Sequence, residues 1–133
     1  MVVRSFPADV SQMDIAREYL EAELEAAECP MKVAMQISVA FEEIFVNVAH
    51  YAYPDKKGDV EVSVETSERR VLVRFVDEGI PFDPLAKADP DTSLSAEERD
   101  IGGLGIYMVK KTMDEVTYEY KDKKNILTLE KSF

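Results

Sequence analysis

The sequence has 133 residues, of which 46% are hydrophobic and 32% charged. A chain of this size buries one sizeable core, so we expect a single domain over residues 1–133. Its 16 basic and 27 acidic residues give a net charge of −11, which repels polyanions and argues against a nucleic-acid partner. The apolar runs are shorter than a membrane span, and the N-terminus lacks the apolar region of a signal peptide. A cytoplasmic protein without membrane contact is therefore expected.

The first half of the chain predicts one strand and two helices. Residues 2–6 (VVRSF) form a short β-rich run. A charged stretch rich in Glu, Ala and Leu, residues 10–27, predicts a helix that Pro30 ends. Residues 31–53 predict a second, longer helix, which stops at Pro54. The single cysteine, Cys29, cannot form an internal disulfide, and we assign it no chemical role.

The second half predicts two hairpins, separated by a long loop and a helix. Residues 59–66 alternate apolar and polar side chains, whereas residues 69–77 are more densely apolar and are predicted to lie more centrally in a sheet. Residues 78–101 read as a loop with three prolines and many acidic residues, a length typical of a functional lid. A helix that opens with glycines and a closing hairpin follow, at residues 102–114, 115–120 and 125–133.

The second predicted helix has two unlike faces. At about 100° per residue, one stripe is apolar and is expected to face the core; its members are Ile37, Phe41, Ile44, Phe45, Val48 and Ala52. The opposite arc holds Glu43, Asn47, Gln36 and His50, with no Lys or Arg among them. A Glu can deprotonate an attacking hydroxyl, and an Asn oxygen one turn further on can bind Mg²⁺. The E-x-x-x-N spacing alone is weak evidence for this chemistry, because a solvated polar stripe can contain it as well.

Two later stretches add candidate ligand contacts. VDEGIPFDP, residues 76–84, ends a strand with Asp77, whose carboxylate could accept a hydrogen bond from an exocyclic amine. Gly79 would permit close approach of a flat ring. IGGLGIYMV, residues 101–109, leads glycines into a helix, where free backbone N–H groups form an anion site. The alternative interpretations are an ordinary strand-to-loop turn and an ordinary loop-to-helix junction.

Taken in order, E-x-x-x-N, D-x-G-x-P-F-D-P, a long loop and G-G-L-G resemble the three boxes of the GHKL (Bergerat-fold) ATPases. The closer resemblance is to the anti-sigma-factor serine/threonine protein kinases, and it covers Phe6 to Phe133. It implies an α+β fold, a two-layer α/β sandwich whose mixed, mainly antiparallel sheet packs on three helices. Nucleotide would lie between helix and sheet, under a lid formed by residues 83–101.

The resemblance also implies roles for individual residues. Glu43 would be the catalytic base and Asn47 the Mg²⁺ ligand, while Asp77 would bind the adenine amine with Gly79 beside the ring. The glycines of the third box would lie under the phosphates. The remaining implied nucleotide contacts are Pro81, Arg99, Gly103, Leu104, Gly105 and Thr128.

Three residues, Arg99, Thr128 and His50, also have other interpretations. Arg99 could reach a phosphate or be a solvated residue of an acidic lid. Thr128 resembles a family threonine near the adenine, but threonine is also a common β-former on a half-buried face. The family often has a histidine where this chain has Tyr51, and His50, which precedes it, is expected to be structural.

The function implied by the resemblance is ATP-dependent phosphorylation of a Ser or Thr on a small STAS-type anti-anti-sigma protein, which regulates a sigma factor. A homodimer is expected on the same grounds. The alternative is a binding module in which nucleotide only shapes a surface that sequesters a sigma factor or other regulator; the intact Glu43 favours the enzyme. The sequence contains neither a dimerisation helix with a phosphoacceptor histidine nor a transducer domain. We therefore do not expect a complete sensor histidine kinase or a gyrase-like machine.

Overall fold

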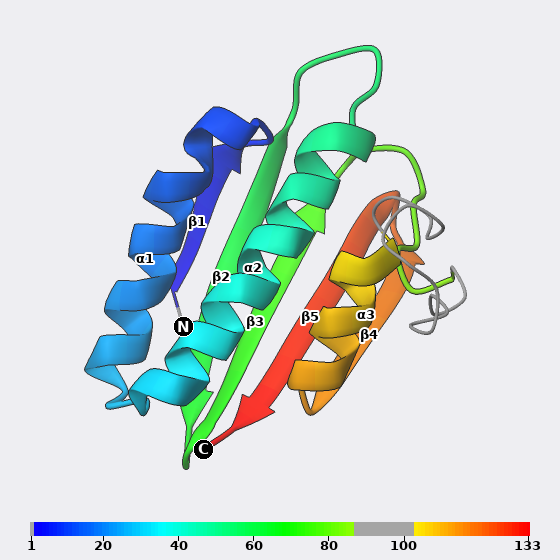
Figure 1. Cartoon of the computed structure of the whole chain (residues 1–133). Coiled ribbons are helices and arrows are strands. Elements are labelled where there is room, and N and C mark those ends of the chain that lie inside the picture. Colours follow the sequence, from blue (N-terminus) through cyan, green and yellow to red (C-terminus); the bar gives the residue numbers. More distant parts are fainter. Residues whose placement is uncertain (1, 87–102) are drawn as a thin grey trace.

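The computed structural model describes residues 2–86 and 103–133, which form two layers, with the helices on one face of a single sheet (Figure 1). The strands are β1 (Val2–Pro7), β2 (Asp59–Ser67), β3 (Arg70–Asp77), β4 (Glu115–Lys121) and β5 (Lys124–Ser132). The helices are α1 (Met13–Ala26), preceded by the 3₁₀ turn η1 (Val10–Gln12), then α2 (Met31–Tyr51) and α3 (Gly103–Thr112). The predicted α+β sandwich, with five strands and three helices, is confirmed.

The strand order in the sheet is β1-β2-β3-β5-β4, and each neighbouring pair is antiparallel. The sheet was predicted to be mixed and mainly antiparallel; among the described strands no parallel pair occurs. In this order β5 lies between β3 and β4 and pairs with both. The last residue of β3, Asp77, therefore lies directly opposite Asn125 near the start of β5. This register brings Asp77 and Asn125 together in the candidate site.

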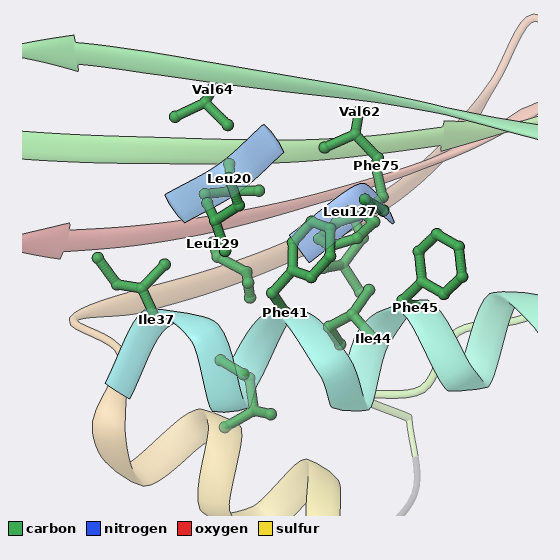
Figure 2. Close-up of a cluster of buried hydrophobic side chains, with 14 of the residues drawn as sticks. Leu20, Ile37, Phe41, Ile44, Phe45, Val62, Val64, Phe75, Leu127 and Leu129 are labelled. Carbon is green, nitrogen blue, oxygen red and sulfur yellow. The ribbon is translucent and has the colours of Figure 1, made fainter. Parts of the chain in front are cut away.

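The core lies between the apolar face of α2 and the sheet. Ile37, Phe41, Ile44 and Phe45 are all at most 1% exposed, as the predicted stripe requires. Figure 2 shows these side chains pointing from α2 toward β2, β3 and β5. Phe41 also packs against Phe75 of β3, with ring centroids 5.1 Å apart. Each such side chain contributes about 1.5–3 kcal/mol on burial, so α2 is held firmly on the sheet.

Tyr53 explains why α2 is two residues shorter than predicted. Its hydroxyl donates to the Asp59 carbonyl (2.7 Å) and accepts from the Glu78 N–H (2.9 Å), so the residue leaves the helix to join the start of β2 to the end of β3. The end of α2 is thereby fixed beside the end of β3. None of the helices in the described part of the chain combines the length and hydrophobicity that a bilayer span requires.

Candidate nucleotide site

Asp77 is a buried carboxylate with one oxygen committed to the protein and one available. Its Oδ1 accepts hydrogen bonds from the Gly79 N–H and from Asn125 Nδ2, both at 2.9 Å. Its Oδ2 accepts none from the residues that the structure describes. Burial raises the pKa of the Asp77 carboxyl above its ordinary value, and the hydrogen bonds from Asn125 and Gly79 act in the opposite direction. The bonds to Oδ1 fix the orientation of the carboxylate, so Oδ2 can accept a hydrogen bond from a donor in the adjoining pocket.

Asn125 holds Asp77 and the following segment together. It is 5% exposed and, besides its bond to Asp77, donates to the Ile80 carbonyl at 2.8 Å. Its Oδ1 accepts from the Phe82 N–H at 3.2 Å and from the Tyr118 hydroxyl. Both donor positions and both acceptor positions of the carboxamide are thus used. The sequence analysis missed this residue, although its alternation with two buried leucines in NILTL places it on the core face.

Thr128 was assigned to the adenine site, and the structure contradicts that assignment. Side chains alternate between the two faces of a strand, so Thr128 lies on the face opposite to Asn125. It pairs across the ladder with Arg74, whose Nε donates to the Thr128 hydroxyl at 3.4 Å. The sheet itself separates Thr128 from Asp77.

Gly79 is required by its packing against the end of α2. A Cβ at this position would lie 2.1 Å from the Ala52 carbonyl oxygen, and the next N–H, of Ile80, donates to that same oxygen at 2.9 Å. Gly79 does not line the pocket, and Pro81 is exposed. Phe82 and Pro84 of the same segment line the pocket instead.

The pocket lies between α2, β3, β5 and the segment after β3. Its lining combines Asn47 and Asp77 with apolar side chains such as Phe75 and Leu127, and Phe82 and Pro84 form the outer wall. Its volume is about 30 Å³, which accommodates one or two water molecules. This volume is smaller than that of a purine ring.

One aromatic contact holds that outer wall. The Phe82 ring stacks on Tyr51 at the end of α2, with centroids 4.8 Å apart and planes at 22°. Both rings remain partly exposed. His50, beside Tyr51, is exposed and does not line the pocket.

Glu43 and Asn47 lie on the predicted shared face of α2, one turn apart. Asn47 lines the pocket, and its side chain makes no hydrogen bond to any described residue. The Glu43 carboxylate lies against α3: a Cβ on Gly105 would be 2.1 Å from Glu43 Oε2. Only a glycine in the first turn of α3 allows this approach.

The third box forms the beginning of α3. Gly103 and Leu104 are its first two residues, and Arg99 lies outside the described residues. The free N–H groups of such a helix start attract anions. Among the described residues, no Lys or Arg lines the pocket, and no group of three or more His, Cys, Asp or Glu side chains could hold a metal ion. Backbone N–H groups at the start of α3 are therefore what the described residues offer an anionic ligand here.

Comparison with known families identifies the class of protein. Residues 6–131 match the family described as the histidine kinase-like ATPase domain, and the chain belongs to that family. It is 22% identical over 99 residues to the serine/threonine-protein kinase BtrW of Bordetella bronchiseptica, covering 74% of this chain and 70% of that one. It is 25% identical over 95 residues to the serine-protein kinase RsbW of Bacillus cereus, covering 68% of this chain. That match spans 59% of the RsbW chain, less than two thirds of its length.

Two solved structures share the fold. One is from the SiaB–SiaC complex of Pseudomonas aeruginosa, with a TM-score of 0.59 and 16% identity over all of this chain and 90% of that chain. The other is the histidine kinase AdeS of Acinetobacter baumannii, with a TM-score of 0.50 and 15% identity over 99% of this chain and 68% of that chain. Membership of the ATPase family implies that this chain binds ATP.

Proposed function

We propose that this protein is an ATP-dependent serine/threonine protein kinase of the anti-sigma type. In this proposal it transfers the γ-phosphoryl group of MgATP to a Ser or Thr of a small STAS-type anti-anti-sigma protein and so regulates a sigma factor. The observation that supports it most is the position of Glu43. Its carboxylate lies against Gly105 in the first turn of α3 and makes no ion pair with a described residue. Similarity to BtrW and RsbW, both named as kinases, supports the same reaction class.

Recognition of the base is assigned to Asp77. Its Oδ2 would accept a hydrogen bond from the exocyclic amine of adenine, while Gly79 and Asn125 hold Oδ1. Guanine would present a carbonyl oxygen to the same carboxylate, and two acceptors facing each other in a buried site cost about 1–3 kcal/mol. The proposal therefore includes a preference for ATP over GTP.

Magnesium is assigned to Asn47. A half-buried carboxamide oxygen without another partner among the described residues suits a hard cation that takes few protein ligands and keeps several waters. When bound, Mg²⁺ neutralises charge on the phosphate oxygens. Asn47 would hold the cation between the base pocket and Glu43, because it lies one turn from Glu43 and lines the pocket that contains Asp77.

Glu43 would act on the acceptor hydroxyl. The hydroxyl oxygen forms a bond to the γ-phosphorus as the bond from that phosphorus to the bridging oxygen breaks, which releases ADP. Glu43 takes the hydroxyl proton during this step. The start of α3 would hold phosphate oxygens through its backbone N–H groups. Positioning and charge neutralisation supply most of the rate enhancement in phosphoryl transfer.

The test compares Glu43→Gln with Glu42→Gln. Glu42 is the matched control, because it precedes Glu43 on α2 but its carboxylate pairs with Arg17 of α1. Both variants should bind MgATP within a few-fold of wild type by titration calorimetry. Transfer of radiolabelled γ-phosphate to proteins of the native cell lysate, followed by phosphosite mapping, should fall about 10²- to 10⁴-fold in Glu43→Gln only. Full transfer by Glu43→Gln would refute the assignment of the base. A wild-type protein that binds MgATP and retains a partner without labelling it would support the binding module instead.

A further inference from the structure

An apolar groove lies between α2 and α3 and ends at the proposed catalytic carboxylate. Met35 and Val39 of α2 and Met108 of α3 form its rims and are 62%, 58% and 47% exposed. Ala40 and Val109, both buried, form its floor. The groove has a volume of about 200 Å³ and is separate from the base pocket. Three large apolar side chains exposed around one hollow are typical of a surface that binds another molecule.

The two ends of the groove differ in charge. Glu43 and Gly105 line one end, where the acceptor hydroxyl would react. At the other end, Thr112 donates its hydroxyl to a carbonyl of its own helix, so it offers the groove little polar character. Lys32 begins the same stripe of α2 one turn before Met35 and is exposed. Lys32 does not line the groove itself, but the stripe of α2 that forms one wall of the groove continues beyond it to this ammonium group.

The length of the groove sets the size of what could occupy it. Glu43 lies eight positions after Met35 on α2, which corresponds to about 12 Å at 1.5 Å per residue. A second helix lying along α2 would cover this distance with the same number of residues, just over two turns. Grooves of this kind take the apolar face of an amphipathic helix, and methionine rims adapt well to such faces.

We propose that this groove docks the segment of the phosphoacceptor protein that carries the acceptor hydroxyl. The inference rests on the proposed kinase function. The segment is an amphipathic helix with the Ser or Thr beside Glu43 and apolar side chains between Met35 and Met108. About eight or more residues from the hydroxyl, it carries an acidic side chain that faces Lys32. The reaction supports this occupant, because the hydroxyl must reach Glu43 and the groove leads there, and because Lys32 complements an acidic group.

The first test adds synthetic helical peptides to protein labelled at the methionine methyl groups and follows the methyl signals by NMR. The probe peptide has one serine, three leucines spaced along one face, and two glutamates at the end distant from the serine. It should shift the methyl signals of Met35 and Met108 and leave Met31 unchanged. A peptide of the same composition with the leucines spread around the helix should not do so. Replacing the two glutamates by lysines should weaken binding about two- to fivefold at low salt. Absence of shifts at Met35 and Met108 up to about 1 mM probe peptide would overturn the inference.

The second test uses variants in the lysate-labelling assay. Met35→Glu and Met108→Glu should bind MgATP within about twofold of wild type but transfer label at least about tenfold less. Met31→Glu is the matched control, because Met31 is 79% exposed on α2 yet does not line the groove. Undiminished labelling by the first two variants, or a change only in self-association, would overturn the docking site and leave the kinase proposal intact. Absence of labelling by wild type would refute the kinase proposal, and the peptide titration would still decide whether the groove binds.

Discussion

Replacing Asn125 by alanine should cost the protein both stability and nucleotide affinity. The carboxamide donates to Asp77 at 2.9 Å and to Ile80 at 2.8 Å, and it accepts from Phe82 and Tyr118. A lost hydrogen bond costs about 1 kcal/mol, and a buried group left without a partner about 1–3 kcal/mol. Water from the adjoining pocket can replace some of these partners. We therefore expect the free energy of unfolding to fall by about 2–4 kcal/mol, below the simple sum.

Urea unfolding at 25 °C measures this loss. With a slope of about 1–3 kcal/mol per molar urea, the midpoint should fall by roughly 1–2 M. Affinity for MgATP should fall as well, because the Asp77 carboxylate loses the group that orients Oδ1. Thr128→Val is the control: it lies on the same strand, faces away from the pocket and makes a single 3.4 Å hydrogen bond with Arg74. Its free energy of unfolding should stay within about 0.5 kcal/mol of wild type, and its affinity for MgATP should not change.

Two outcomes would refute this reasoning. A loss below about 1 kcal/mol in Asn125→Ala would mean that its four partners find equivalent hydrogen bonds elsewhere. A loss of nucleotide affinity in Thr128→Val equal to that in Asn125→Ala would mean that the binding face of the sheet has been wrongly assigned.

Further predictions concern three single positions, Asp77, Gly105 and Lys123. Wild type should prefer ATP to GTP by at least about tenfold in competition against a fluorescent nucleotide, and Asp77→Asn should remove most of that preference, because a carboxamide both donates and accepts. Burial raises the pKa of the Asp77 carboxyl, so between about pH 3.8 and the folded-state pKa the folded protein holds the carboxyl proton that the unfolded chain has lost. The free energy of unfolding of wild type, relative to Asp77→Asn, should therefore fall as pH rises from about 3.8 to the folded-state pKa, and a flat difference would contradict it. Gly105→Ala should displace the Glu43 carboxylate and reduce phosphate transfer at least about tenfold without unfolding the protein, as transfer and circular dichroism assays would show. Lys123→Gly should raise the free energy of unfolding by about 0.5–1 kcal/mol in urea titrations, because φ at Lys123 is +63°.

Local patterns in the sequence predicted the elements well, and the reason is physical. The 3.6-residue period of α2 is strong because one face buries Phe41 and Phe45 while the other carries Glu43 and Asn47. Element ends were less predictable, because they depend on distant contacts. α2 ends early since Tyr53 bonds to β2 and to the residue after β3, neither of which a local pattern contains.

The sequence predicted a residue of the candidate site correctly only where a local motif also determines the position of that residue in the fold. Asp77 lies at the end of its strand as expected, whereas the nearby side chain on β5 is Asn125 rather than Thr128. The choice between these two depends on the pairing of β3 with β5, which a local pattern does not determine. The contact of Glu43 with Gly105 likewise depends on how α2 packs on α3. The third box predicted the glycine but not the carboxylate that it accommodates.

The pairing of β5 with β3 also has a consequence for the growing chain on the ribosome. Asp77 and Asn125 are 48 residues apart, so at about 5–20 residues per second the second partner is made some 2–10 s after the first. During that interval β3, with its apolar sequence, has an unpaired edge, which is a site for aggregation. ATP cannot protect this intermediate, because a ligand stabilises only the state that binds it, and the acceptor is oriented only when β5 is in place. The stabilising effect of nucleotide therefore begins only with the completed sheet.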